Sequence, residues 1–133
     1  MKKAQKAGYP DFVCYGQPEH MVAVARLKPA LAYIDRHFAT ELTAGVAAAK
    51  CHLSLSRFVH LFKEKCGIGF SAYLTERRIE EARRLLSGSR LSIFDVALRC
   101  GFQSQSYFGA IFRRKTGHSP AAYRQKFQHR HDP

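Results

Sequence analysis

Residues 42–53 read LTAGVAAAKCHL, and residues 91–102 read LSIFDVALRCGF, which is a second copy of the same pattern. Equivalent positions lie at a constant offset and carry identical or similar residues. The equivalent pairs are Leu42 and Leu91, Thr43 and Ser92, Ala48 and Ala97, Cys51 and Cys100, and Leu53 and Phe102. A pattern repeated in this way indicates that one small structural unit occurs twice in the chain.

The repetition continues past these stretches, but the offset becomes one residue larger. The later pairs are Phe58 and Phe108, Phe62 and Phe112, Lys63 and Arg113, Gly67 and Gly117, and Tyr73 and Tyr123. The second copy therefore has one extra residue between Phe102 and Phe108. Insertions collect in turns, where they break no packing register. Each copy predicts a short helix, a turn and a longer helix.

Basic residues dominate the chain: 22 Lys and Arg stand against 10 Asp and Glu, which gives a formal net charge of +12. An excess of this size suits a polyanion such as DNA, RNA or an anionic membrane surface. Two helix-turn-helix units combined with this charge predict a DNA-binding protein. The basic residues also cluster, at Arg77-Arg78, Arg83-Arg84 and Arg113-Arg114-Lys115.

The composition narrows the class of protein further. With 133 residues, 46% of them hydrophobic, the chain has enough apolar material for one domain or for two very small ones sharing a core. Its apolar runs are far shorter than the roughly 18 residues of a membrane span. Basic residues open the chain but no apolar segment follows them. We therefore expect neither a membrane protein nor a signal peptide.

Four Cys residues occur without a C-x-x-C pair. Two of them, Cys51 and Cys100, occupy equivalent places in the two copies. We expect buried, reduced thiols in a reducing cytoplasm. A zinc site is a weaker alternative, because the spacing of its candidate ligands fits no common pattern. Those ligands would be Cys51, His52, Cys66 and Cys100.

Hydrophobic periodicity and capping residues divide the chain into segments. Residues 1–24 contain Gly and Pro without a helical period, so we expect a flexible N-terminal arm or linker. A helical period begins near Ala25 and lasts to about Ala39. Ser or Thr then precedes each helix of the two repeats, and Gly67 and Gly117 follow the longer ones.

These signals predict an all-α fold of seven helices, with two helix-turn-helix subdomains joined by a long linker helix. In the linker, Glu80 and Arg84 have the i, i+4 spacing of an ion pair on the exposed side. The expected boundaries are 25–127 for the DNA-binding domain and 128–133 for a basic tail. Within the domain we expect the first helix-turn-helix at about 43–65, the linker helix at about 71–86 and the second helix-turn-helix at about 92–116.

Steps of 100° per residue separate an inner from an outer face in each longer helix. The inner positions are Leu55, Phe58, Leu61 and Phe62 in the first, and Phe108, Ile111 and Phe112 in the second. The outer positions are Ser56, His60 and Lys63 in the first, and Ser106, Ala110 and Arg113 in the second. Only the start of such a helix enters the major groove deeply, so base contacts should come from the first two turns.

Two stretches carry a resemblance to a known family. Residues 93–124 read IFDVALRCGFQSQSYFGAIFRRKTGHSPAAYR, and residues 48–63 read AAKCHLSLSRFVHLFK. They resemble the signature and the upstream motif of the AraC/XylS family of bacterial transcription regulators, and the similarity extends over about residues 27–125. The resemblance implies a seven-helix domain with two helix-turn-helix units that binds promoter DNA.

The candidate DNA contacts lie on the two longer helices. The family's base-reading positions fall on Ser56, Val59 and His60 in the first unit and on Gln105, Ser106, Gly109 and Ala110 in the second. Arg57 flanks the same face and is a further base-reading candidate. The candidates for phosphate contacts are Ser54, Lys63, Ser104, Tyr107, Arg113 and Arg114.

Three places depart from the residues that the family often carries. Val59-His60 stand where polar or Arg side chains are frequent, and Gly109-Ala110 replace a frequent Ser-Arg pair. Gly69-Phe70 stand where Ser-Pro is frequent, at the start of the linker helix. The second longer helix therefore offers few hydrogen-bond donors in its second turn.

We expect a sequence-specific DNA-binding transcription regulator, an activator, that binds an asymmetric promoter site through two major-groove recognition helices. Its partners would be double-stranded DNA and RNA polymerase in the bacterial cytoplasm, in association with the nucleoid. We expect no catalytic residue, cofactor, metal or membrane contact. If the chain is part of a longer regulator, we also expect an effector domain or ligand as a partner.

Two other classes of protein compete with this hypothesis. A non-specific architectural nucleic-acid binder would account for the charge, although it needs no second reading helix. Specific binding should exceed non-specific binding by roughly 10³ or more, which separates the two. An enzyme with Cys51 or Cys66 as its nucleophile, as in DNA repair, would need an exposed and easily ionised thiol.

Overall fold

The computed structural model describes residues 18–128, and their side chains from residue 24 onward. This part of the chain contains seven α-helices and no strand, which confirms the prediction of an all-α, seven-helix fold. The helices are α1 (Pro18–His37), α2 (Ala44–Lys50), α3 (Leu55–Cys66), α4 (Phe70–Gly88), α5 (Ile93–Arg99), α6 (Gln105–Thr116) and α7 (Pro120–Phe127).

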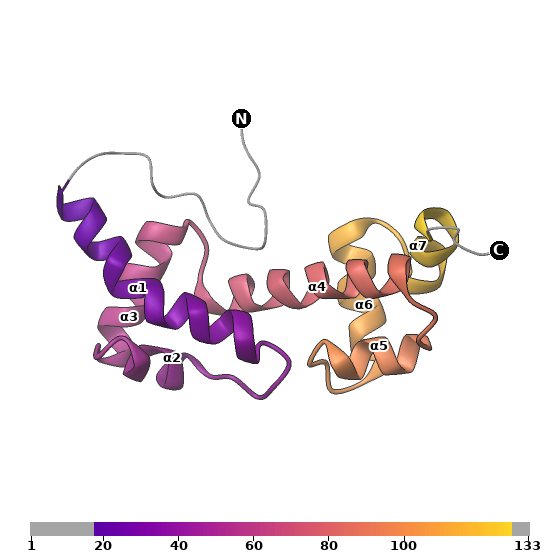
Figure 1. Cartoon of the computed structure of the whole chain (residues 1–133), viewed down its shortest axis with the longest axis horizontal. Coiled ribbons are helices and arrows are strands. Elements are labelled where there is room, and N and C mark those ends of the chain that lie inside the picture. The colour runs from indigo at the N-terminus through magenta and orange to yellow at the C-terminus, as the bar shows by residue number, and fades with distance from the viewer. Residues whose placement is uncertain (1–17, 129–133) are drawn as a thin grey trace. The chain divides into compact units, whose positions relative to one another are not determined.

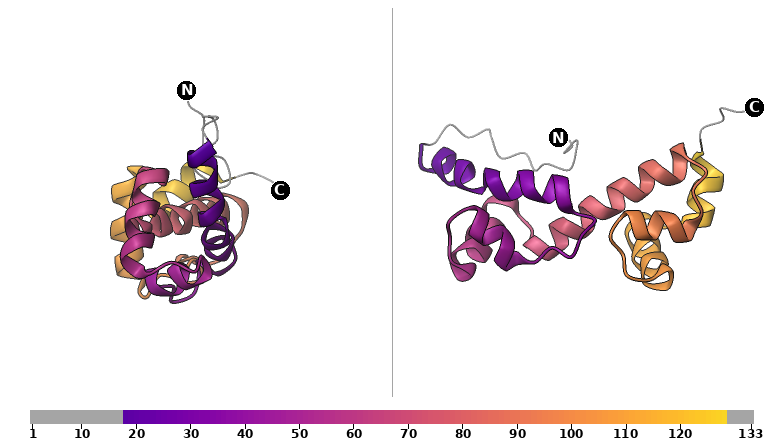
Figure 2. Two further views of the ribbon diagram at one scale, coloured as in Figure 1. Left: turned by 90° about the vertical axis from the view of Figure 1, so that its left-hand side faces the viewer. Right: turned by 60° about the horizontal axis from the view of Figure 1, so that its bottom comes forward.

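The chain divides inside α4 into two compact units, of which the first ends at Arg77 and the second begins at Arg78. Figure 1 shows α1, α2 and α3 gathered with the first turns of α4, and α5, α6 and α7 gathered with its last turns. The right-hand view of Figure 2 shows the same grouping within each unit. The linker helix thus contributes one half to each helix-turn-helix unit.

The first unit has a hydrophobic core built around two aromatic residues of α3. Phe58 and Phe62 are fully buried. Phe70 of α4 meets both rings edge-on, at centroid distances of 5.8 and 5.9 Å, and Tyr73 meets Phe62 at 5.4 Å. Edge-to-face pairs at such distances stabilise beyond the area that they bury. The other helices complete this core with Leu27, Ala30, Leu31 and Ile34 of α1 and Ala47 and Ala48 of α2.

The second unit repeats this arrangement around α6. Phe108 and Phe112 are fully buried, and the Phe102 ring lies 5.0 Å from that of Phe108. Tyr123 of α7 meets Phe112 edge-on at 5.2 Å, as Tyr73 meets its partner in the first unit. The other buried members of this core are Ile79, Ala82 and Leu86 of α4, Val96 and Ala97 of α5, Cys100, and Ile111 of α6. Each unit has its own hydrophobic cluster, whereas the composition had indicated either one domain or two very small ones sharing a core.

Each helix of the two repeats begins at a capping side chain, as predicted. A side-chain oxygen at the N-cap accepts from the backbone N–H three residues later, which satisfies one of the unpaired donors of the first turn. The four bonds run from Val46 to Thr43 (3.2 Å), Arg57 to Ser54 (3.2 Å), Asp95 to Ser92 (3.0 Å) and Tyr107 to Ser104 (3.0 Å).

The turn of each helix-turn-helix has the hydrogen-bond pattern of a Schellman motif. The N–H groups donate to carbonyl oxygens of the preceding short helix. The four bonds, all 3.0 Å long, run from His52 to Ala49, Leu53 to Ala48, Gly101 to Leu98 and Phe102 to Ala97. This motif needs one left-handed residue, which is His52 (φ 57°) in the first turn and Gly101 (φ 95°) in the second.

The structure also locates the extra residue of the second copy. Leu53 directly precedes the cap Ser54, whereas Gln103 separates Phe102 from the cap Ser104. The insertion therefore lies in the turn, as predicted, and α3 and α6 have the same length of 12 residues.

Two helix boundaries differ from the sequence prediction. α1 begins at Pro18 rather than near Ala25. Proline is favoured in the first turn of a helix, because the N–H groups there make no hydrogen bonds within the helix and the missing N–H of proline costs nothing. The end of the expected flexible arm is therefore helical. Its remainder, residues 1–17, and residues 129–133 of the expected tail lie outside the described residues. α4 begins at Phe70, one residue early, since this ring is buried in the first core.

Candidate nucleic-acid interface

The outer face of α3 contains the residues expected to contact DNA in the first unit. Its first two turns present side chains that can donate to or accept from base edges, in the part of a helix that enters the major groove. One turn later the same face presents an ammonium group. The exposed candidates are Ser54, Ser56, Arg57, Val59, His60 and Lys63.

The inner face of α3 agrees with the sequence prediction except at Leu55. Phe58 and Phe62 are fully buried, and Leu61 packs against the core. Leu55 is 52% exposed, so its assignment to the core was wrong. It is the first residue of the helix, and because side chains tilt toward the helix N-terminus it projects past the core. The outer surface of α3 thereby gains an apolar side chain.

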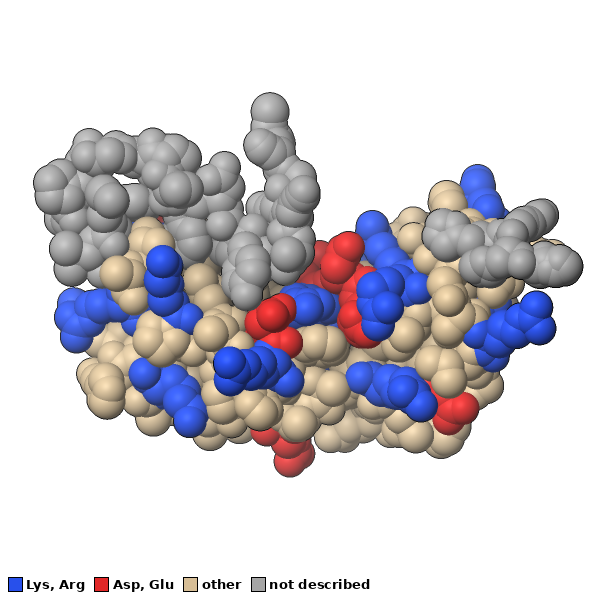
Figure 3. Space-filling model, in the orientation of Figure 1, with Lys and Arg blue, Asp and Glu red and all other residues tan. Residues whose placement is uncertain are grey.

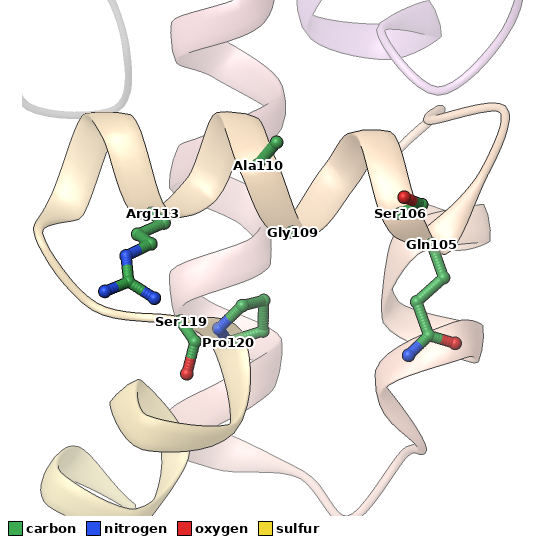
Figure 4. A pocket seen from close by; sticks show the side chains of 7 residues that line it. All are labelled: Gln105, Ser106, Gly109, Ala110, Arg113, Ser119 and Pro120. Carbon is green, nitrogen blue, oxygen red and sulfur yellow. The ribbon is translucent and has the colours of Figure 1, made fainter.

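The second unit presents an open groove along α6 where α3 has larger side chains. Its volume is about 550 Å³, and Figure 4 shows Gln105 and Arg113 directed to the same side of α6 as Ser119. The groove exists because the middle of the α6 face carries only a glycine and an alanine. Its lining residues are Gln105, Ser106, Gly109, Ala110 and Arg113 of α6, with Ser119 and Pro120 at the start of α7.

Sequence reasoning missed Ser119 and Pro120 as neighbours of this face. The side chain of Ser119 caps α7 by accepting from the N–H of Ala122 at 3.1 Å, and Pro120 occupies the first helical turn. The sequence signals the helix start, but only the packing of α7 beside α6 shows that it borders the groove.

Positively charged side chains follow the base-reading positions on both helices. Lys63 of α3 and Arg113 and Arg114 of α6 are exposed in the last helical turns. Figure 3 shows basic side chains distributed over the face that it draws, with fewer acidic ones between them. Such groups suit phosphates, since phosphate contacts position a protein on DNA without reading its sequence.

Three further phosphate candidates are hydroxyl groups. The hydroxyl oxygens of Ser54 and Ser104 accept the capping hydrogen bonds of α3 and α6. Each hydroxyl group can still donate a hydrogen bond to a phosphate oxygen. Tyr107 is exposed in the first turn of α6. All three lie at helix starts, where the backbone dipole also favours an anion.

One of the clustered arginines of α4 is engaged inside the first unit. Arg77 donates two hydrogen bonds to Oδ1 of Asp35 in α1, from Nη2 at 2.8 Å and from Nε at 3.1 Å. Its guanidinium also lies 4.5 Å from the centre of the Phe38 ring. These contacts fasten α4 to α1, so Arg77 stabilises the fold and is no candidate for a phosphate contact.

Two arginines of the second unit also have partners within it. Arg84 pairs with Glu81 at 2.6 Å rather than with the expected Glu80, because residues three apart on a helix are as close as residues four apart. Arg124 of α7 donates from Nε to the backbone oxygen of Leu86 at 3.0 Å. It satisfies a carbonyl at the end of α4, which has no partner within the helix.

The cysteines that the structure describes are unsuited to nucleophilic chemistry. Burial raises the pKa of Cys66 to about 12 and also raises the pKa of Cys51, whereas the thiolate is the reactive form. Cys100 is fully buried. Among the side chains that the structure describes, from residue 24 to residue 128, no three His, Cys, Asp or Glu residues form a group that could hold a metal ion. No helix between residues 18 and 128 is sufficiently long and apolar to cross a bilayer.

The fold and this surface define a DNA-binding domain with two helix-turn-helix units, and known proteins agree. Residues 47–126 match a family described as a helix-turn-helix domain. The chain is 31% identical to the C-terminal domain of AraT, a response regulator from Geobacillus stearothermophilus, with a TM-score of 0.77 over 81% of this chain and 90% of that one. It is 33% identical to the DNA-binding domain of AdpA, a global transcriptional factor solved with a target DNA, with a TM-score of 0.73 over 77% and 92%.

Curated relatives give the family. The chain is 39% identical over 95 residues to the uncharacterised transcriptional regulator YijO of Escherichia coli K12, and 37% identical over 103 residues to the transcriptional activator RhaS of Escherichia coli O1:K1. The matches cover 71% and 77% of this chain but 34% and 37% of those proteins, so the chain spans about a third of their length. The chain belongs to the AraC family of transcription regulators, which confirms the predicted resemblance and the prediction that it is no enzyme.

Proposed function

We propose that this chain activates transcription by binding an asymmetric promoter site, with α3 and α6 each in a major groove. The observation that carries the proposal is the pair of capped helices whose first turns present an exposed, mostly polar face. The two units are a tandem repeat within one sequence, and their exposed side chains differ. A single chain therefore offers two different reading surfaces, and its site should have two different halves.

The proposal assigns base reading to the first two turns of α3 and α6 and phosphate contacts to their caps and later turns. DNA binding falls to residues 25–127, with the helix-turn-helix units at about 43–65 and 92–116. The base-reading residues are Ser56, Arg57, Val59, His60, Gln105, Ser106, Gly109 and Ala110. The phosphate-contacting residues are Ser54, Lys63, Ser104, Tyr107, Arg113 and Arg114.

Activation is supported by the similarity to RhaS, which is named an activator. An activator acts on RNA polymerase, so polymerase is the proposed protein partner, and the bacterial nucleoid in the cytoplasm is the proposed place of action. Because the matches cover only 34% and 37% of these curated relatives, we also propose that an effector-binding domain or ligand governs this domain in a longer regulator.

Selection of bound sequences from random DNA tests the proposal. The expected result is one asymmetric consensus, bound at least roughly 10³ times more tightly than unrelated DNA. Binding that is equal for all sequences would instead indicate a non-specific architectural protein. A clean palindrome bound by two chains would contradict the asymmetric arrangement. Transcription from a promoter that contains the selected site, with and without the protein, then tests activation.

A further inference from the structure

Two exposed apolar side chains lie on the first two turns of α3, beside its outer face. Leu55 is 52% exposed and Val59 is 43% exposed. They are four residues apart, so they lie one above the other along the helix. Single exposed apolar residues are ordinary on protein surfaces, but these two stand beside Ser56 and His60 on the first two turns of the helix.

We propose that Leu55 and Val59 recognise the C5-methyl groups of thymines, so that the first unit selects a site with thymine at two positions. This inference rests on the proposed function, since it names what part of the same interface reads. Thymine alone among the four bases presents a methyl group in the major groove, and apolar side chains are the groups that contact it.

The position of Leu55 suits such a contact. It is the first residue of α3, directly after the cap Ser54, and its side chain tilts toward the helix N-terminus. The N-terminal end of a recognition helix is the part that enters the groove most deeply. Val59 follows one turn later and would reach a neighbouring base pair.

A protein partner fits this surface less well than DNA does. Two half-exposed aliphatic side chains offer far less than the roughly 800 Å² that each partner contributes to a stable protein interface. Their neighbours on the exposed side of α3 are Arg57, His60 and Lys63, which are polar or positively charged. Small apolar side chains beside polar and positively charged ones suit the major groove of DNA, where the methyl groups of thymines lie between negatively charged phosphates.

The second unit carries different chemistry at the equivalent positions. Gln105 of α6 takes the place of Leu55, directly after its own cap Ser104, and Gly109 takes the place of Val59. A glutamine amide pairs with adenine through two hydrogen bonds. The same position of the fold therefore serves thymine in one unit and adenine in the other.

Removal of single methyl groups from DNA tests the inference. The probe is the site selected with the full chain, labelled with fluorescein, in which each thymine is replaced in turn by deoxyuridine. Binding is measured by fluorescence anisotropy. Two replacements under the first unit should each weaken binding by the wild-type chain about fourfold, because one buried carbon group contributes about 0.8 kcal/mol.

Variants connect each methyl group to a side chain. Leu55→Ala should lose sensitivity to one replacement and Val59→Ala to the other. Leu55→Gln copies the second unit, and repeated selection with it should replace the thymine at that position by adenine. Val46→Ala is the matched control: Val46 is also 40% exposed but lies on α2, and its truncation should leave both sensitivities intact.

The outcomes separate this inference from the function on which it rests. If no consensus emerges from the selection, both are overturned. A consensus whose deoxyuridine replacements leave wild-type binding unchanged under the first unit overturns the methyl contacts alone. Equal sensitivity to the deoxyuridine replacements in the wild type and in both alanine variants also overturns the methyl contacts alone. A change in sedimentation behaviour of Leu55→Ala without a change in DNA preference would assign the pair to a protein contact instead.

Discussion

The two reading helices, α3 and α6, are alike where the fold requires it and different where they face outward. Both have 12 residues, begin after a capping serine and end at a left-handed glycine. Their buried phenylalanines occupy equivalent positions. The equivalent pairs outside the cores differ almost throughout: Leu55 and Gln105, Arg57 and Tyr107, Val59 and Gly109, and His60 and Ala110. Caps and cores therefore define the repeated unit, while its outer face varies independently of the fold.

This difference gives the two units different means of recognising DNA. The face of α3 offers Ser56, Arg57 and His60, whose side chains donate or accept on base edges. The face of α6 offers Gln105 and Ser106 and then a groove without polar side chains in its middle. We expect the first unit to read more base pairs and the second to depend more on phosphate contacts and DNA shape.

The largest expected effect tests whether the two units are energetically separate. Phe62→Ala and Phe112→Ala each remove a fully buried ring, and each should lower the free energy of unfolding by ~3–5 kcal/mol. Because each ring belongs to its own cluster, hydrogen exchange should accelerate mainly in the unit that carries the change. An unchanged melting temperature would contradict the burial, and equal acceleration in both units would indicate one cooperative core.

The next prediction concerns the unequal reading faces. Each good bidentate contact favours the correct base over a wrong one by ~1–3 kcal/mol. Single base-pair changes under the first unit should therefore weaken binding more than those under the second. His60→Ala should relax preference at one position, whereas Ala110→Arg should add a preference under the second unit. A competition assay over all single substitutions of the selected site measures both. If the stronger half lies under the second unit, Gln105 is the main reader.

Most of the fold could be predicted from the sequence, because its signals are local. The repeated pattern, the Ser and Thr caps and the glycines after α3 and α6 each specify a boundary through nearby backbone hydrogen bonds. The start of α1 was misplaced because proline reads as a breaker inside a helix but is favoured in a first turn. The start of α4 shifted by one residue because Phe70 packs into the first core, which no local signal shows.

The site could be predicted only in part, since helical angles describe direction but not depth. They correctly placed Phe58 and Phe62 inward, yet Leu55 lies beyond the end of the core and is exposed despite its inward angle. The roles of individual arginines depend on partners from other elements. Arg77 meets Asp35 of α1, and Arg124 meets the end of α4, so positive charge alone did not reveal their function.

A comparison of two arginines of the second unit separates DNA contact from structural support. Arg113→Ala should weaken binding to all sequences alike and reduce the slope of log affinity against log salt by about 1, because one phosphate contact is lost. Its melting temperature should stay unchanged, since the side chain is exposed. Arg124→Ala should do the reverse, with a loss of ~1 kcal/mol in stability and an unchanged slope. A change of preference at one base pair in Arg113→Ala would show that Arg113 reads a base.

The smallest expected effect compares the two turns. Both Schellman motifs need a left-handed residue, but only the second turn supplies glycine. Gly101→Ala should cost ~1–2 kcal/mol, because a Cβ is crowded in that conformation. His52→Gly should change stability by less, a gain of at most ~1 kcal/mol, since the relief of strain is offset by the greater freedom of glycine in the unfolded chain.

Gly101→Asn is the control that distinguishes backbone strain from lack of space. Asparagine is larger than alanine but tolerates the left-handed region better. If φ is the cause, Gly101→Asn should be more stable than Gly101→Ala in thermal unfolding, and the reverse order would mean that the side chain meets a neighbour. His52, at φ 57°, lies near the centre of the left-handed region, where histidine is more frequent than most residues. Gly101 has φ 95°, further from that centre, so the second turn should depend more strictly on its glycine than the first depends on any one residue.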